Sequence, residues 1–252
     1  MSGKILDSRD LHRLYDIFGL ARRYDIEVSS HRIELFKQRL SEFFQEINFK
    51  LSEKDHVICL CAGSCTEGVA LAELYGCRVT CIDARRDALL KGRKFARERG
   101  IEIDVIAGDV LELSKLVNAS DFKLATLLGN SIPHFNVTAF DKIIKETYGI
   151  LADNGAFLVD LYDVAFKILT SYRYAILERE DPLTISLHHS FDFENGCFKR
   201  TFIKFPEASK ITVPIYIWTP SFVKYMFAVN NLENVHLKIV NGNYAMVIGF
   251  KT

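Results

Sequence analysis

The chain has 252 residues, 49% of them hydrophobic and 25% charged, so it can bury one large domain or a core with a small lobe. Lysine plus arginine and aspartate plus glutamate both number 32, and this neutral balance disfavours a nucleic-acid partner. The first residues contain no apolar signal-peptide region, and no run approaches the roughly 18 apolar residues of a membrane span. We therefore expect a cytoplasmic protein without a membrane partner.

Residues 57–83, VICLCAGSCTEGVALAELYGCRVTCID, organise the rest of the chain. Residues 57–60 have the length of a buried parallel strand, and the small residues 61–68 include Gly63, where backbone can approach a ligand closely. A short helix and a second strand follow, and this strand ends in Asp83. An acidic residue about 20 positions beyond such a turn is typical of ribose binding in Rossmann-like sheets. The stretch predicts a nucleotide-cofactor unit.

Five of the six cysteines lie in this stretch, which suggests a metal or redox site. The stretch contains no C-x-x-C pair and no histidine, however. Alternation puts Cys59 and Cys61 on one face of the same strand, so we interpret the thiols as small buried residues and expect no metal. A disulfide between neighbouring strands is the alternative.

Apolar residues at helical spacing predict two N-terminal helices within residues 10–47, broken near residues 28–30, with Ser30 capping the second helix. After Asp83, helices alternate with buried strands. The predicted helices are residues 85–99, 110–117 and 137–151, and the predicted strands are residues 101–106, 123–128 and 156–161.

Beyond residue 173 the pattern becomes rich in strands. Four antiparallel strands are predicted at residues 174–177, 184–193, 197–205 and 211–218, with a hairpin turn at Asn195-Gly196. A helix at residues 221–229 and a closing hairpin of strands 235–240 and 244–250 follow.

These elements predict an α/β fold with a Rossmann-like, mostly parallel seven-stranded sheet, an antiparallel last strand and helices on both faces. We expect an N-terminal helical lid at residues 1–50 and a core at residues 51–173 and 219–252. The antiparallel β insertion at residues 174–218 is expected to cover the substrate.

Polar residues follow two predicted strands at their carboxyl ends, where open α/β sheets bind ligands. Asp109 follows the third strand, and it either faces a ligand or caps the helix that begins at Val110. Asn130 and His134 follow the fourth strand, and they either face the crevice or serve as turn and cap residues. These three side chains are candidates for a site at the sheet edge.

The turn after the first strand is not G-x-G-x-x-G, and the chain has no phosphate loop ending in G-K-[ST]. Both motifs cradle pyrophosphate or triphosphate groups at a helix N-terminus. Because Asp83 still indicates an adenosine ribose, the pattern favours a nucleoside cofactor without phosphates.

The chain resembles a class I S-adenosylmethionine-dependent methyltransferase in four features and in their order. They are the VICLCAGSCTEG turn, Asp83, Gly108-Asp109 and the loop after strand four. The LADNG turn at residues 151–155 and the closing Asn-Gly hairpin resemble further parts of that family. GNSxxH at residues 129–134 is similar to a loop of glycine N-methyltransferase and its relatives. YD at residues 24–25 and RxxxFK at residues 32–37 resemble the N-terminal segment of that group, which closes over the cofactor.

The resemblance implies S-adenosylmethionine as cofactor, with Asp83 on its ribose, Asp109 at its adenine amino group and Arg32 on its carboxylate. The implied cofactor-binding residues are Arg32, Cys61, Ala62, Gly63, Asp83, Ala84, Asp109, Val110, Leu128 and Gly129. The implied catalytic residues, which face the substrate or close the pocket, are Tyr24, Asn130 and His134.

Three cysteines depart from the pattern of this family. Cys59 stands where the family usually has an acid, and Cys61 and Cys65 replace two loop glycines, so their β-carbons narrow the approach to the loop. Residues 161–163, Leu-Tyr-Asp, lack the arginine that the glycine enzyme uses on its substrate carboxylate. Glycine is therefore disfavoured as the substrate.

The expected function is methyl transfer from S-adenosylmethionine to a small molecule, with an amine nitrogen as the acceptor. The cofactor supplies the electrophile, so the protein mainly aligns the reactants, and His134 or a tyrosine could take a proton from the amine. The alternatives are methylation of oxygen or carbon, and a non-catalytic subunit that binds S-adenosylmethionine.

Overall fold

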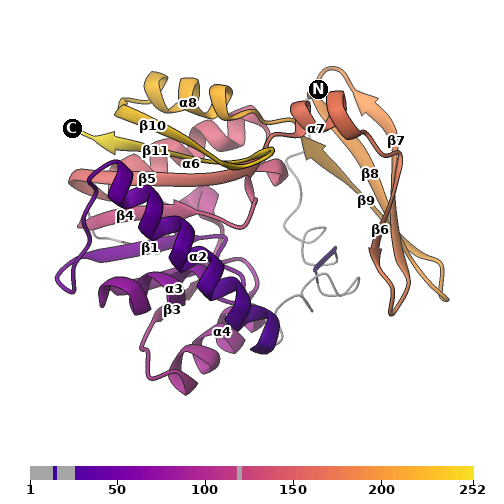
Figure 1. Ribbon diagram of the computed structural model, residues 1–252. Helices are drawn as coiled ribbons and strands as arrows, with labels where there is room; N and C mark the ends of the chain where they lie inside the picture. The colour runs from indigo at the N-terminus through magenta and orange to yellow at the C-terminus, as the bar shows by residue number, and fades with distance from the viewer. Residues whose placement is uncertain (1–13, 16–25, 118–120) are drawn as a thin grey trace.

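A seven-stranded sheet forms the centre of the computed structural model, which describes residues 14–15, 26–117 and 121–252 (Figure 1). The strand order is β10-β11-β5-β4-β1-β2-β3. All of these strands run parallel except β11, which is antiparallel to both neighbours. The strands are β1 (His56–Leu60), β2 (Arg78–Asp83), β3 (Asp104–Ala107), β4 (Phe122–Leu127), β5 (Leu151–Tyr162), β10 (Leu232–Asn241) and β11 (Tyr244–Lys251). The predicted Rossmann-like fold is confirmed.

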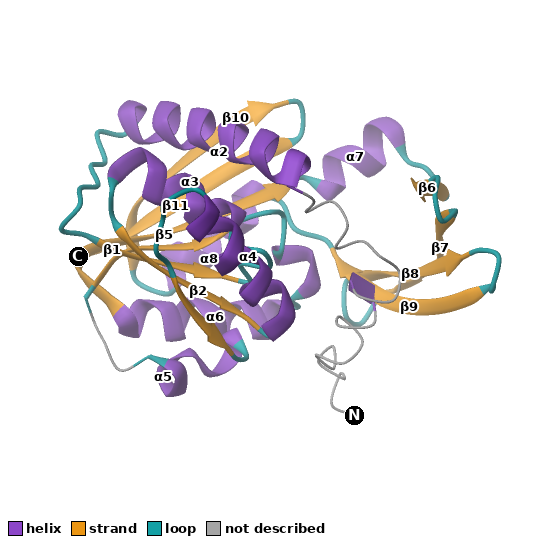
Figure 2. Cartoon of the chain, turned by 90° about the horizontal axis from the view of Figure 1, so that it is seen from below, coloured by secondary structure: helices purple, strands orange, loops and turns teal. Residues whose placement is uncertain are grey.

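Helices cover both faces of this sheet because successive side chains of a strand point to opposite faces (Figure 2). On β1, Ile58 and Leu60 join one apolar cluster, whereas Val57 and Cys59 join the other. The first cluster includes residues of α5 (Leu113–Leu116), α6 (Val137–Ile150) and α8 (Pro220–Val229). The second cluster includes residues of α2 (Ile26–Glu46), α3 (Thr66–Tyr75) and α4 (Arg86–Glu98). The strand ends, with their loops, stay uncovered by these layers.

The clustered cysteines belong to the packing of the second face. Cys59 and Cys81 lie opposite each other on β1 and β2, and all six thiols are free. A β-carbon at Gly68 of α3 would lie 2.8 Å from Cys81 Sγ, so the helix rests directly on these sulfur atoms. No group of three or more metal-binding side chains occurs in the described part of the chain. The thiols act as small apolar side chains that let α3 approach the sheet.

The N-terminal helix differs from its prediction. Helix α2 runs without interruption through residues 28–30, so the predicted break and the Ser30 cap are wrong. Ile33, Phe36 and Leu40 are buried at helical spacing against the sheet. Valine and serine are only slightly unfavourable in a helix, and this packing outweighs their preference.

The fifth strand also differs from its prediction. It begins at Leu151, which pairs with Phe122 of β4, and the expected turn at residues 153–155 lies inside it as an irregularity of register. A β-carbon at Gly155 would lie 2.8 Å from the carbonyl oxygen of Ala152, so only glycine fits this tight backbone. Helix α7 (Val164–Ser171), which follows β5, was not predicted.

A second, four-stranded antiparallel sheet lies beside the core in the order β6-β7-β8-β9 (Figure 1). Its strands are β6 (Ala175–Arg179), β7 (Thr184–Asp192), β8 (Cys197–Lys204) and β9 (Ser209–Tyr216), close to the predicted spans. Trp218, just beyond β9, donates its indole N–H to the Phe135 carbonyl at 2.9 Å, which ties this sheet to the loop after β4. No helix in the described ranges is long and apolar enough to cross a membrane.

We expect Gly92→Ala to destabilise the fold by roughly 1–3 kcal/mol, because the new β-carbon would lie 2.3 Å from the Ser64 carbonyl oxygen. Gly92 is the buried position at which α4 packs on the loop after β1. The matched control is Gly149→Ala in α6, because its added β-carbon would meet nothing within 4 Å beyond its chain neighbours and its own helix backbone. Urea unfolding of both variants checks this, and equal free energies of unfolding would contradict the close contact.

Candidate functional site

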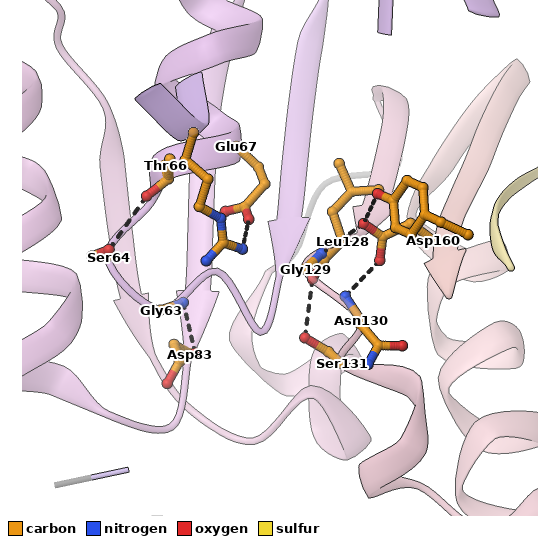
Figure 3. Close-up of polar contacts among 12 residues, drawn as sticks. Gly63, Ser64, Thr66, Glu67, Asp83, Leu128, Gly129, Asn130, Ser131 and Asp160 are labelled. Atoms are coloured by element: carbon orange, nitrogen blue, oxygen red, sulfur yellow. Dashed lines mark hydrogen bonds and ion pairs between the residues drawn. The ribbon is translucent and has the colours of Figure 1, made fainter. Parts of the chain in front are cut away.

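The carboxylate of Asp83 joins the loops at the ends of β1 and β2. It is 6% exposed, and its Oδ2 accepts the Gly63 N–H at 2.8 Å (Figure 3). Its Oδ1 accepts the Arg85 backbone N–H at 2.8 Å and faces Arg85 Nε at 3.2 Å. Each carboxylate oxygen has two lone pairs, so the group can fix this loop and still accept a bond from a ligand.

The loop after β1 takes an unusual backbone path. Cys61, Gly63 and Cys65 have φ values of +52°, +53° and +59°, a region in which L-residues other than glycine are strained. Burial, followed by the neighbouring carboxylates of Asp83 and Asp109, raises the pKa of the Cys61 thiol well above its usual value. Cys61 is therefore a neutral, weakly polar side chain beside Asp83.

The structure confirms one of the two roles predicted for Asp109, that of a helix cap. Its Oδ1 accepts the Leu111 N–H at 2.9 Å at the start of a short 3-10 helix, Val110–Glu112. The continuous helix predicted from Val110 is split into this 3-10 turn and α5. Asp109 lies at the carboxyl end of β3, and capping uses one of its two oxygens, so the cap and a ligand role are compatible.

Asp160 fixes the loop after β4 and was missed as a site residue in the sequence. It is fully buried in β5 and accepts the backbone N–H groups of Gly129 at 2.9 Å and Asn130 at 2.6 Å (Figure 3). Tyr244 of β11 donates its hydroxyl to the same carboxylate at 2.5 Å. Burial raises the pKa of Asp160 to about 6, although these three donors lower it. The signal in the sequence is a single acid within the otherwise apolar run of residues 156–161.

An ion pair between α2 and α3 lies next to the loop after β4. Arg32 of α2 bonds Glu67 of α3 at 2.9 Å, and both side chains are partly buried. A β-carbon at Gly129 would lie 3.0 Å from Arg32 Nη2 and 3.3 Å from Glu67 Oε1. Gly129, with φ of +78°, thus lets the backbone pass beneath the pair. Glu67 was not predicted as a site residue.

His134 lies at the end of a short 3-10 turn, Ile132–His134, and meets Tyr15 from the N-terminal segment. The Tyr15 hydroxyl and His134 Nε2 are 2.8 Å apart, and the Arg85 guanidinium lies 4.6 Å from the centre of the Tyr15 ring. Burial, with a smaller effect of Arg85, lowers the pKa of His134 to about 4. His134 is therefore neutral, and its buried Nδ1 has no hydrogen-bond partner among the described residues.

Asn130 is held by its own side chain as well as by Asp160. Its Oδ1 accepts the Tyr162 N–H at 3.0 Å, and its backbone has a φ of +57°. The predicted turn role of Asn130 is therefore confirmed, because its side chain connects the loop after β4 to the end of β5. Its amide Nδ2 has no bond to another described residue.

Two cavities lie at these strand ends and share one wall. The first contacts ten of the predicted residues, namely Arg32, Cys61, Ala62, Asp83, Ala84, Asp109, Val110, Leu128, Gly129 and His134. The second runs toward α7 and the four-stranded sheet and contacts Asn130. Tyr15, Arg32, Gly129 and His134 line both cavities. Gly63 lines neither cavity, since its N–H bonds Asp83, and Tyr24 lies outside the described residues.

Tyr244→Phe should destabilise the protein by roughly 1.5–3 kcal/mol at about pH 8, because the ionised Asp160 loses a hydroxyl donor. Burial and the carboxylate raise the pKa of Tyr244, so its hydroxyl stays protonated. Asp160 has a folded-state pKa of about 6, above the usual 3.8, so the folded protein binds a proton near pH 5 that the unfolded chain has lost. The cost of Tyr244→Phe therefore shrinks as pH falls through 6.

Urea unfolding at about pH 5 and pH 8 measures this difference. Tyr225→Phe is the matched control, since Tyr225 is 60% exposed and its ring contact with Phe222 does not involve the hydroxyl. A cost for Tyr244→Phe that is the same at both pH values would show that Asp160 does not titrate in this window.

Comparison with known proteins finds one family match, and it contains loops of this site. Residues 57–155 match the family described as a methyltransferase domain. This segment contains the three loops of the first cavity, which carry Asp83, Asp109 and Gly129. No curated protein sequence matches the chain.

Solved structures of low sequence identity share the fold over nearly the whole chain. PH0226 from Pyrococcus horikoshii OT3 is 18% identical, covers 97% of both chains and has a TM-score of 0.66. An S-adenosylmethionine-dependent methyltransferase from Clostridium acetobutylicum is 13% identical, covers 96% of this chain and 98% of its own, and has a TM-score of 0.70. A third similar structure is CalS10, an amino pentose methyltransferase from Micromonospora echinaspora solved with S-adenosylmethionine bound. It is 12% identical, the match covers 95% of this chain and 97% of CalS10, and the TM-score is 0.61.

The match of residues 57–155 and the strand order agree with each other. The family match supports the methyltransferase class that the sequence motifs implied, and it does not bear on the glycine-specific subtype. Residues 57–155 thus match a methyltransferase domain, and the chain shares the fold of solved S-adenosylmethionine-dependent methyltransferases.

Proposed function

We propose that this methyltransferase transfers a methyl group to an amine nitrogen of a small molecule held in the second cavity, with S-adenosylmethionine in the first. The observation that carries the proposal is the wall formed by Tyr15, Arg32, Gly129 and His134, which contacts both cavities. Methyl transfer requires the donor and the acceptor to meet in line, and two cavities that meet at one wall provide such an approach.

The residues of the first cavity fit the cofactor chemically. The Asp83 carboxylate has spare lone pairs for ribose hydroxyls, and Asp109 has one oxygen that its cap does not use. The buried Arg85 Nη1 has no hydrogen-bond partner among the described residues. Buried donors are normally hydrogen-bonded, so this one supports a polar ligand in the cavity. We assign the ribose to Asp83, the adenine to Asp109 and the cofactor carboxylate to Arg32.

The remaining predicted cofactor residues supply surface for the same ligand. Ala62 and Gly129 offer close backbone approach, and Leu128 is a buried apolar neighbour for the sulfonium region. Cys61, Ala84 and Val110 complete this surface. Gly63 acts through its N–H bond to Asp83, which orients the carboxylate.

His134 and Asn130 would hold the acceptor. S-adenosylmethionine, when bound, would supply a methyl group whose bond to the sulfonium sulfur breaks as the acceptor nitrogen bonds the methyl carbon, with S-adenosylhomocysteine as the leaving group. The neutral His134 can accept a hydrogen bond from an amine N–H and so direct the nitrogen lone pair. Its low pKa makes it a weak base, so we assign it to orientation and proton relay with Tyr15. Asn130 would offer its amide Nδ2 to the acceptor, and Tyr24 would help to close the pocket.

One resemblance favours an amine acceptor over oxygen or carbon. The GNSxxH loop at residues 129–134 is similar to that of glycine N-methyltransferase and its relatives. We further propose that residues 1–50 form a lid, that residues 51–173 and 219–252 form the catalytic core, and that residues 174–218 cover the acceptor. A cytoplasmic location and the absence of a nucleic-acid partner stay predictions from composition.

Asp83→Asn should weaken S-adenosylmethionine binding by roughly 10-fold or more, because a neutral amide accepts poorly from ribose hydroxyls. Isothermal titration calorimetry of the full chain measures this. Asp104→Asn is the matched control, since Asp104 is an exposed residue at the opposite end of β3. If the parent and Asp83→Asn bind S-adenosylmethionine with equal affinity, Asp83 is not part of the cofactor site. If the parent does not bind S-adenosylmethionine, the proposed function is wrong.

His134→Phe should keep S-adenosylmethionine binding and lower turnover of an amine by roughly 100-fold, since the ring remains while both nitrogens are lost. Formation of S-adenosylhomocysteine with a panel of amines, and a product mass increased by one methyl group, measure this. The exposed His236 of β10 provides the control variant His236→Phe. Methylation found on oxygen or carbon would replace the amine assignment.

A further inference from the structure

We infer that the acceptor of this enzyme carries a carboxylate or phosphate group, which the second cavity binds between α7 and the four-stranded sheet. This inference rests on the proposed function, because it names the class of amine that the enzyme would methylate. It follows from the charge of the cavity, from an unpartnered histidine and from the arrangement of these groups relative to the shared wall.

Positive charge prevails among the described residues of the second cavity. Its cationic side chains are Arg32, Lys167, Arg173 and Arg200, and its acidic side chain is Glu178. Glu178 is already bound by Arg200 and by the Ser186 hydroxyl, the latter at 2.5 Å. Lys167 and Arg173 form no ion pair with any described residue. Two positive charges therefore face the cavity without a balancing acid from the described chain.

His188 of β7 supplies polar groups that lack a partner. Both ring nitrogens are buried, and neither has a hydrogen-bond partner among the described residues. Burial, followed by the charges of Arg200 and Lys167, lowers the pKa of His188 to about 4, so the ring is neutral and offers one donor and one acceptor. Buried polar groups in folded proteins are normally satisfied, so an unsatisfied pair in a cavity wall points to a ligand.

An aromatic surface surrounds this histidine. The ring of His188 stacks on Phe198 at 5.1 Å between centroids and lies 5.9 Å from the Tyr172 ring. All three rings line the second cavity. The cavity therefore combines flat apolar surface with cationic side chains, which suits an anionic group attached to an apolar or aromatic body.

The residues that line the second cavity form two sets of different chemistry. His134 and Gly129 belong to the wall shared with the first cavity, whereas Lys167, Arg173 and His188 line only the second. An acceptor with an amine at one end and an anion at the other matches this arrangement. An acceptor with a second positive charge would be repelled by Lys167 and Arg173.

Calorimetric titration with three ring compounds of similar size tests the inference on the full-length chain. Benzoate and phenyl phosphate carry the two candidate anions, and benzyl alcohol is the neutral match. We expect at least one anion to bind about 10-fold tighter than benzyl alcohol. The double variant Lys167→Gln/Arg173→Gln should lose about 10-fold in affinity for that anion.

Lys210→Gln/Lys224→Gln is the control, because it removes the same charge from two exposed residues outside the cavity. Tighter binding of benzoate identifies a carboxylate site, and tighter binding of phenyl phosphate a phosphate site. Equal binding of benzyl alcohol, or equal losses in the two double variants, would overturn the inference.

The same samples are titrated with S-adenosylmethionine to separate this inference from the proposed function. Cofactor binding without anion selectivity removes the anionic acceptor and leaves the methyltransferase assignment of the two cavities intact. No cofactor binding by the parent removes the proposed function, and with it the assignment of the second cavity as an acceptor site.

Discussion

The buried carboxylate of Asp160 is the constraint on which the site depends. A charge inside a sheet is costly unless several donors surround it, and here two backbone N–H groups and the Tyr244 hydroxyl do so. Those two N–H groups belong to Gly129 and Asn130, so satisfying the carboxylate also fixes the loop after β4. The loop then carries Gly129 beneath the Arg32–Glu67 pair and extends toward His134.

Asp83 repeats this arrangement on the other side of the crevice. The strand order reverses between β1 and β4, and such a switch point leaves an open crevice at the carboxyl ends of the strands. Asp83 bonds Gly63 on the β1 side, and Asp160 bonds the loop after β4, so each rim of the crevice is held by a carboxylate from a neighbouring strand. The loops that line the first cavity are thus held by carboxylates of the sheet.

The second cavity is built differently. Its outer wall comes from α7 and the four-stranded sheet, which follow β5 in the chain and are tied back to the core through Trp218 and the loop after β4. The same core could therefore serve another ligand if the residues of this wall changed, because Lys167, Arg173 and Arg200 line the second cavity and not the first. The two proposed binding sites therefore have different origins, the first at the edge of the central sheet and the second at a wall added by α7 and the four-stranded sheet.

Local sequence patterns determined the alternation of helices and strands, the seven-stranded sheet and the place of Asp83, Asp109 and His134 at strand ends. These patterns are local: apolar residues repeat every two positions in a strand and about every 3.6 in a helix, and a turn directly follows its buried strand. Only the tertiary structure decided the roles of Glu67, Tyr15 and Asp160. Tyr15 meets His134 across 119 residues, and Tyr244 meets Asp160 across 84, so no local pattern contains these contacts. The uninterrupted helix α2 has the same cause, since its packing against the sheet outweighs the weak local preference for a break at residues 28–30.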